Sequence, residues 1–262
     1  MVSLIYELWN SPFKKLVFLI ILRYIDINFL GRAIMSCKDK IKMMLWNLGL
    51  RETIPASVIN CVHINENNEE LVDIKQDKKL YFSDELQQRS AVYLRKSVYE
   101  KIKKAQEELP DNYFFKIYSA FRPHEEQIQL WNKNYQEIKT NNPTLSEQEI
   151  VNETKAVCAD PRFGFGGHQT GGAVDITLCD AKGKDYDMGT VYLEVSSKTP
   201  TKSNGLTDEQ KLNRSILKRS MENAGFKNYP HEWWHFCYGD RMWGAYSKRK
   251  DCFYGMPRQS GR

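Results

Sequence analysis

Residues 167–178 read GHQTGGAVDITL and run from a glycine-rich loop into a strand pattern. Five of the fifteen glycines lie between positions 164 and 172, and a loop so rich in glycine brings its backbone close to a ligand or a partner. From Ala173 to Leu178, three large apolar residues alternate with Ala, Asp and Thr, which is the period of a strand. Asp175 therefore leaves the predicted strand on the side of small or polar neighbours. A carboxylate in this place, aimed at the loop residue His168, suits a metal site.

The flanking sequence predicts helices and strands in irregular order. The expected elements are a helix over 94–109, a strand over 115–121, a helix after Pro123, helices begun by capping boxes at Ser146 and Thr207, and a strand over 232–237. Because helices and strands do not alternate regularly, we expect an α+β fold with a mainly antiparallel central sheet flanked by helices. With 262 residues, the chain has room for one catalytic domain, at 51–262, after an N-terminal extension over 1–50.

The N-terminal extension contains a short apolar segment. Leu16–Leu22 is a wholly apolar run of seven residues that follows two lysines, and it is far shorter than the roughly 20 residues that span a bilayer. We expect an amphipathic or core-packing helix here. Contact with a membrane surface and a signal sequence are the alternatives.

Charge and cysteine usage narrow the class of protein. The net charge is +5, but lysines and arginines are scattered, so we expect no nucleic-acid partner. The six cysteines contain no CxxC pair, which argues against a cysteine-type zinc site and against a disulfide framework. This usage favours a reducing compartment and a cytoplasmic location, with a membrane-associated or periplasmic location as the alternative.

The histidines point to a zinc site. A catalytic zinc ion takes three protein ligands and keeps a fourth position open, and the chain has only five histidines to supply them. Residues 231–235 read HEWWH, which matches the HExxH pattern in which both histidines bind zinc from one helix. No Glu or His follows this segment, and its aromatic residues favour a strand over a helix. We therefore interpret Glu232 and His235 as the functional pair and His231 as incidental.

Two further residues have chemistry that suits peptide hydrolysis. Glu232 stands three residues before His235, so it could take a proton from a metal-activated water and pass it to the leaving amine. The alternative is a surface carboxylate paired with a lysine. Arg122, at the end of the predicted strand, could donate two hydrogen bonds to an oxyanion, and its alternative is an ion pair at a helix start.

Four segments together resemble the D-Ala-D-Ala dipeptidase family associated with vancomycin resistance, within the wider lysostaphin, D-Ala-D-Ala metallopeptidase and hedgehog group. The segments are Ser119–Pro123, Gly167–Leu178, Asp187–Thr190 and Glu232–Phe236, within a similarity from about Leu71 to about Trp243. The resemblance implies a hedgehog- or D,D-peptidase-like fold with the zinc site on the sheet. It implies one zinc ion per chain, held by His168, Asp175 and His235, with Glu232 as the general base and Arg122 stabilising the transition state.

Two departures from the family pattern concern the substrate. Family dipeptidases place an aspartate soon after the Met-Gly pair, where it holds the substrate ammonium, whereas this chain has Val191–Glu194, with Glu194 as the candidate replacement. The family's Arg-Tyr-Ala-Thr segment is replaced by Ile74–Asp77. Either change could open the site to longer peptides.

The resemblance implies zinc-dependent hydrolysis of the D-Ala-D-Ala dipeptide in cell-wall peptide metabolism, with a small D-Ala peptide as the substrate. One alternative is a D,D-carboxypeptidase or endopeptidase that acts on longer muropeptides. Alternatives from another class are a non-catalytic, zinc-stabilised binding module and a cell-wall-binding protein tethered by its N-terminal segment.

Overall fold

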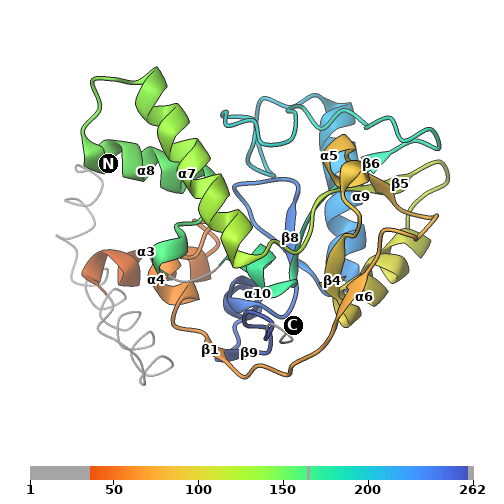
Figure 1. The fold of residues 1–262 in the computed structure, drawn as a ribbon, viewed down its shortest axis with the longest axis horizontal. Helices are drawn as coiled ribbons and strands as arrows, with labels where there is room; N and C mark the ends of the chain where they lie inside the picture. The colour runs from red at the N-terminus through yellow and green to blue at the C-terminus, as the bar shows by residue number, and fades with distance from the viewer. Residues whose placement is uncertain (1–35, 164–165, 259–262) are drawn as a thin grey trace, which may run out of the picture. The chain divides into compact units, whose positions relative to one another are not determined.

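The computed structural model describes residues 36–163 and 166–258 (Figure 1). The chain divides into two compact units, residues 1–61 and 62–262. In the first unit, the described elements are α3 (Cys37–Asn47) and α4 (Ala56–Ile59). The apolar run Leu16–Leu22, for which we expect a helix, lies outside the described residues. Among the helices in the described part, none is both long and apolar enough to span a bilayer.

The second unit is built around a five-stranded sheet with the strand order β3-β5-β6-β8-β7. Its strands are β3 (Tyr81–Phe82), β5 (Phe114–Ser119), β6 (Ala173–Cys179), β7 (Lys227–Asn228) and β8 (His235–Cys237). β3 joins β5 in parallel, and the other three pairings are antiparallel, so the sheet is mixed. The expected combination of helices with a sheet is confirmed.

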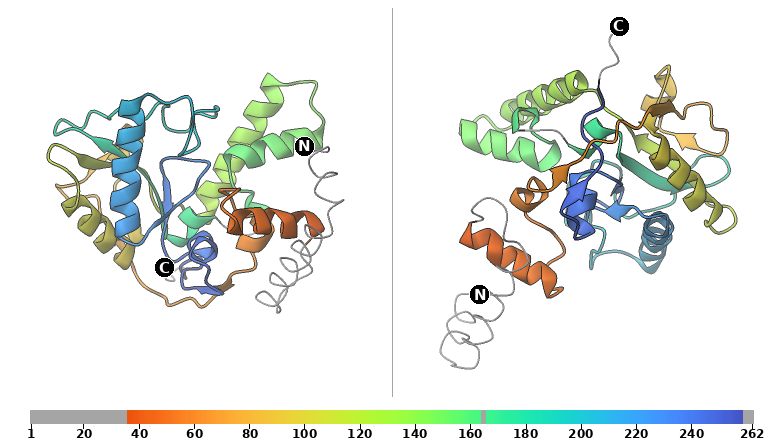
Figure 2. Two further views of the ribbon diagram at one scale, coloured as in Figure 1. Left: turned by 180° about the vertical axis from the view of Figure 1, so that it is seen from behind. Right: turned by 90° about the horizontal axis from the view of Figure 1, so that it is seen from below.

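The two faces of the central strand β6 meet different surroundings. Val174, Ile176 and Leu178 belong to the main hydrophobic core, together with residues of α6 (Lys96–Glu107) and α9 (Asp208–Asn223), two helices in contact with each other (Figure 2). Ala173, on the other face, packs with α10 (Arg241–Tyr246). Every residue of β6 is buried, because a central strand is covered on both faces. The face that carries Asp175 is therefore the one directed away from α6 and α9.

The helix boundaries follow the capping signals of the sequence. The boxes formed by Ser146 with Glu149 and by Thr207 with Gln210 are both present, at the start of α8 (Glu147–Val157) and of α9. Gly225, with φ 97°, follows the end of α9 in the left-handed conformation that favours glycine. The remaining elements are β1 (His63–Ile64), β2 (Leu71–Asp73), α5 (Asp84–Gln88), β4 (Tyr93–Arg95), α7 (His124–Asn141), η1 (Pro161–Phe163), η2 (Gly167–Thr170) and β9 (Asp251–Cys252).

One predicted strand is shorter than expected. The strand expected over 232–237 begins only at His235, because the preceding residues form a turn in which the Glu232 amide donates to the Tyr229 carbonyl at 3.0 Å. The His235 amide then donates to the Glu232 carbonyl at 3.3 Å. The aromatic residues of this segment predicted that it is not a helix, and it is not one. Glu232, however, lies outside the sheet.

Candidate metal centre

Three side chains from η2, β6 and β8 meet on one face of the sheet. The register of β6 and β8 sets Asp175 opposite His235, and directly opposed residues project to the same face. His168 lies in η2, the short helix that leads into β6. The Asp175 Oδ1 atom lies 2.9 Å from His235 Nδ1 and 3.2 Å from His168 Nε2. The structure therefore brings together the three residues that the sequence predicted as ligands, with one ligand atom of each within 4.8 Å of the others.

The orientation of the His168 ring is set by the neighbouring backbone. Its Nδ1 atom lies 2.9 Å from the carbonyl oxygen of Ala120, so Nδ1 carries the proton as a donor and Nε2 faces Asp175. All three side chains are at most 11% exposed. Two imidazole nitrogens and one carboxylate oxygen that converge in this way form a donor set that fits zinc.

Electrostatics within the cluster are dominated by the central carboxylate. Burial disfavours its charged form, but His168 and His235 outweigh burial and hold the pKa of Asp175 far below its usual range. Burial likewise disfavours a charged His235, yet hydrogen bonding to Asp175 raises the pKa of His235 to about 9. The buried carboxylate of Asp175 therefore favours the protonated form of His235.

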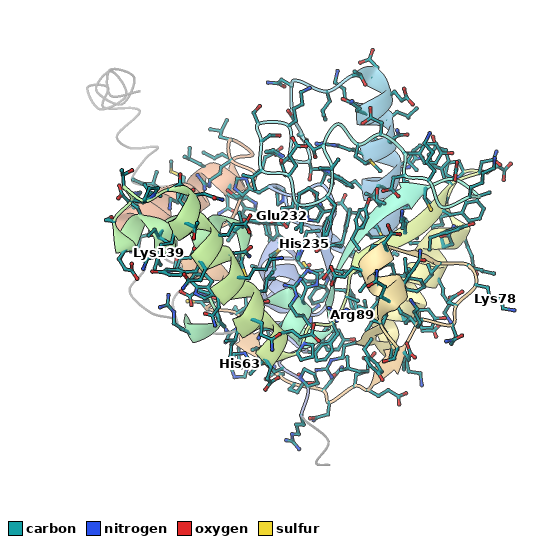
Figure 3. All side chains as sticks on the ribbon, turned by 45° about the horizontal axis from the view of Figure 1, so that its top comes forward. His63, Lys78, Arg89, Lys139, Glu232 and His235 are labelled. Carbon is teal, nitrogen blue, oxygen red and sulfur yellow. The ribbon has the colours of Figure 1, made fainter. Side chains whose placement is uncertain are left out.

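Glu232 lies next to His235, at the edge of this cluster (Figure 3). Its Oε2 atom is 3.9 Å from His235 Nδ1, and its side chain is 32% exposed, compared with 6% for Asp175. Burial raises the pKa of Glu232 to about 7, so the carboxyl can gain or lose a proton near neutral pH. His231 lies outside the cluster, with its ring exposed and 5.4 Å from the ring of Tyr229.

Arg122 is tied to the same loop through its backbone. Its amide donates to the His168 carbonyl at 3.0 Å. Its guanidinium donates to Gln127 Oε1 at 3.0 Å and to Ser119 Oγ at 3.1 Å, and Ser119 pairs with Asp175 in the sheet. No ion pair to Arg122 occurs among residues 36–163 and 166–258, so the helix-start ion pair considered above is not seen there. The guanidinium is held by neutral groups and keeps its charge available to an anion.

A cleft of about 420 Å³ opens beside the cluster. It is lined by Tyr118, Thr177, Asp185, Tyr186, Asp187, Met188, Gly189, Thr190, Val191, Tyr192, Glu194 and Trp233. Glu194 lies on the wall of this cleft and outside the three-residue cluster, and its Oε2 atom accepts from the Val191 amide at 3.3 Å. Tyr192 belongs to both places, because its ring lines the cleft and its hydroxyl donates to Asp175 Oδ2 at 2.8 Å. No local pattern in the sequence singles out Tyr192.

The glycines of the glycine-rich loop are explained by close contacts within the protein itself. A side chain at Gly167 would collide with the buried carboxylate of Asp240, and a Cβ atom at Gly172 would lie 2.6 Å from the Tyr238 carbonyl oxygen. The glycines therefore let η2 approach the segment that follows β8, which sets the position of His168. The sequence signal was correct in predicting a close approach, but the partner is the protein itself.

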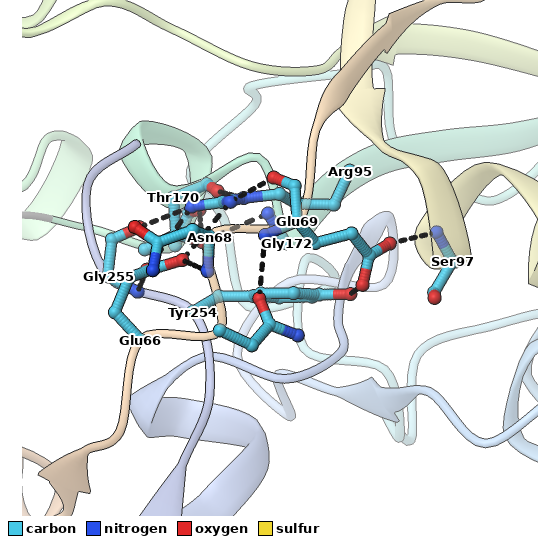
Figure 4. Close-up of polar contacts among 11 residues, drawn as sticks. Glu66, Asn68, Glu69, Arg95, Ser97, Thr170, Gly172, Tyr254 and Gly255 are labelled. Carbon is cyan, nitrogen blue, oxygen red and sulfur yellow. Dashed lines mark hydrogen bonds and ion pairs between the residues drawn. The ribbon is translucent and has the colours of Figure 1, made fainter. Parts of the chain in front are cut away.

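The buried side chain of Arg95 also holds η2 in place, through its C-terminal end (Figure 4). Arg95 is 1% exposed, and its Nε donates to the Thr170 carbonyl at 2.8 Å while its backbone amide donates to the Gly171 carbonyl at 3.0 Å. Its Nη2 donates to the Gly255 carbonyl at 3.1 Å, and its Nη1 lies 3.2 Å from Glu66 Oε1. No local pattern in the sequence marks Arg95, because its partners are far from it along the chain.

Comparison with known proteins identifies the family. The model of the M15 peptidase family, described as D-ala-D-ala dipeptidase, matches residues 78–255. The chain belongs to the D-Ala-D-Ala dipeptidase family. The resemblance inferred from the four sequence segments is thereby confirmed.

Three D-alanyl-D-alanine dipeptidases are among the similar proteins. That of Synechocystis sp. is 34% identical over 105 residues, which cover 34% of this chain and 42% of the relative. That of Escherichia coli is 27% identical over 125 residues, which cover 46% of this chain and 52% of the relative. That of Enterococcus faecium is 34% identical over 74 residues, which cover 28% of this chain and 37% of the relative. The chain thus aligns with about half or less of the length of these relatives.

Two solved structures are among those similar to the chain. One is a mutant of the D,D-pentapeptidase VanY in complex with Zn(II), with a TM-score of 0.42 at 16% identity over 74% of this chain and 96% of that one. The other is VanYB in complex with D-alanine-D-alanine, with a TM-score of 0.42 at 16% identity over 70% and 86%.

Proposed function

We propose that this member of the D-Ala-D-Ala dipeptidase family is a zinc-dependent peptidase that hydrolyses the D-Ala-D-Ala dipeptide. The proposal rests above all on the convergence of His168, Asp175 and His235, with the ionisable carboxyl of Glu232 beside them. Three protein ligands are typical of a catalytic zinc site, whereas a structural site takes four. A non-catalytic binding module would need neither Glu232 nor an unpaired guanidinium at Arg122.

Each residue of the site has its own role in the proposed hydrolysis. His168, Asp175 and His235 would hold one zinc ion, which would supply Lewis acidity to the scissile carbonyl and to water. Glu232 takes a proton from the attacking water and delivers it to the leaving amine. Arg122 donates hydrogen bonds to the oxygen of the scissile carbonyl as negative charge develops on it.

The substrate assignment combines the family with the cleft. Relatives of the chain are D-alanyl-D-alanine dipeptidases, and VanYB binds D-alanine-D-alanine. Glu194 supplies a carboxylate on the cleft wall, and we assign to it the free ammonium of the dipeptide. The catalytic domain in this proposal is 51–262, and residues 1–50 form an N-terminal extension. A cytoplasmic location is supported by the free thiols of Cys158, Cys179, Cys237 and Cys252.

The test is a substrate comparison with zinc-loaded protein. D-Ala-D-Ala, L-Ala-L-Ala and a muropeptide pentapeptide ending in D-Ala-D-Ala are each incubated with the wild-type chain and with Glu194→Gln. We expect release of D-Ala from the dipeptide, no cleavage of the L,L dipeptide, and a raised KM for the dipeptide in Glu194→Gln. Cleavage of the pentapeptide alone would establish the longer-muropeptide alternative, and zinc binding without any cleavage would overturn the proposal.

A further inference from the structure

The two oxygens of Asp175 have different partners. Oδ1 faces both histidines, at 2.9 Å from His235 Nδ1 and 3.2 Å from His168 Nε2. Oδ2 accepts a hydrogen bond of 2.8 Å from the Tyr192 hydroxyl. The carboxylate is therefore held in one orientation, with a single oxygen directed into the cluster.

The ring of Tyr192 is fixed by neighbouring aromatic side chains. It stacks on Tyr118 with ring centroids 4.4 Å apart and 15° between the planes, and it meets the edge of Trp234 at 5.5 Å and 77°. Aromatic contacts of this kind restrict a ring to one rotamer. The Tyr118 hydroxyl bonds to Asp185 instead, so only one hydroxyl of the stacked pair reaches the cluster.

The loop that carries Tyr192 directs this residue inward. Its neighbours Val191 and Leu193 are 71% and 61% exposed, and Leu193 adopts φ 66°. Arg214, a buried side chain of α9, anchors the loop by donating to the carbonyls of Met188 at 2.7 Å and Lys198 at 2.8 Å. The loop is therefore braced on both sides of Tyr192.

We propose that Tyr192 is a positioning residue that makes Asp175 a one-oxygen ligand of the proposed zinc ion. A carboxylate with both oxygens free can bind a metal through both and fill a coordination position. A hydroxyl that occupies Oδ2 prevents this and keeps the fourth position of the zinc open for water and substrate. Partners that orient a metal ligand also tune metal affinity. This inference rests on the zinc site of the proposed function.

The test uses two tyrosine variants of the same stacked pair. Tyr192→Phe keeps the ring and removes the hydroxyl that bonds Asp175, whereas Tyr118→Phe removes the hydroxyl that bonds Asp185. Zinc affinity is measured by competition with a chromophoric chelator. We expect Tyr192→Phe to bind zinc about 10-fold or more weakly, which is the usual effect of losing such a partner, and Tyr118→Phe to bind zinc as the wild type does.

A second measurement separates positioning from a general loss of structure. In the cobalt-substituted protein, the visible absorption of Tyr192→Phe should be weaker than that of the wild type, because Co(II) absorbs less strongly when its coordination number rises. Urea unfolding of the metal-free variants checks that both remain folded.

The outcomes distinguish this inference from the proposed function. If the wild type binds zinc and cleaves its substrate while Tyr192→Phe keeps both its zinc affinity and its cobalt spectrum, the inference on Tyr192 is wrong and the function stands. Equal losses of affinity in the two variants would also overturn it. A wild-type chain that binds no zinc would overturn both.

Discussion

Replacing Arg95 with Met tests whether the buried arginine holds the metal-binding loop in place. Its guanidinium donates to the carbonyls of Thr170 and Gly255 at 2.8 and 3.1 Å and to that of Glu69, and it lies over the Tyr254 ring with its Cζ 5.0 Å from the centroid (Figure 4). These partners come from three separate parts of the chain. Met fills a similar volume but donates no hydrogen bond, so the substitution isolates the polar contribution.

The expected loss follows from the acceptors left behind. Three carbonyls lose their donor, at about 1–1.5 kcal/mol each, which sums to about 3–4.5 kcal/mol. This range agrees with the cost of about 3–5 kcal/mol for removing one partner of a buried ion pair, here with Glu66. Thr170 ends the short helix that carries His168, so zinc affinity should fall together with stability.

The assay is urea unfolding of the metal-free protein, followed by circular dichroism. The matched control is Arg89→Met, since Arg89 forms exposed ion pairs with Glu85 and Glu126 that contribute about 1 kcal/mol or less. We expect the free energy of unfolding to fall by about 3–5 kcal/mol for Arg95→Met and by less than about 1 kcal/mol for the control. Equal effects of the two substitutions would refute the role assigned to Arg95.

Four further predictions concern the proposed zinc site. His168→Ala and His235→Ala should each lose the thermal stabilisation that zinc gives the wild type, about 2.7 kcal/mol at a free zinc concentration 100 times the Kd; one zinc per chain by elemental analysis of either variant would contradict the ligand assignment. Glu232→Gln should retain zinc and lower kcat at least about 100-fold, and unchanged turnover would exclude a role as base. Burial raises the pKa of Glu232 to about 7, and the base must be ionised to accept a proton. We therefore expect kcat/KM to fall as the pH is lowered from 8 to 5, and a profile that is flat over this range would contradict the role of Glu232 as the base. Because the pKa of His235 is raised to about 9 and its proton must leave, zinc affinity should rise about tenfold per pH unit from pH 7 to 9, as isothermal titration would show.

Local features of the fold follow from short segments of sequence. The capping boxes at Ser146 and Thr207 predict where α8 and α9 begin, since each needs only residues three positions apart. The alternation in residues 173–178 likewise predicts β6 and the face of Asp175. The four matched segments and their order predict the family, because this pattern depends only on residue identities and not on the folded structure.

The geometry of the site depends on contacts between distant residues. Asp175 and His235 are sixty positions apart, and only the pairing of β6 with β8 sets them opposite each other. Glu232 lies outside the expected strand because its backbone amide is hydrogen-bonded within the turn before β8. No local sequence pattern indicated this turn. Tyr192 and Arg95 were missed for the same reason, since the value of a hydroxyl or guanidinium depends on what the folded chain places next to it. The sequence by itself thus determined the helix starts, the central strand and the ligand candidates, because hydrogen bonds within a few residues and side-chain alternation encode them. Only the tertiary structure decided which of these groups converge and what holds them in place, because strand register and loop packing arise from contacts across the whole domain.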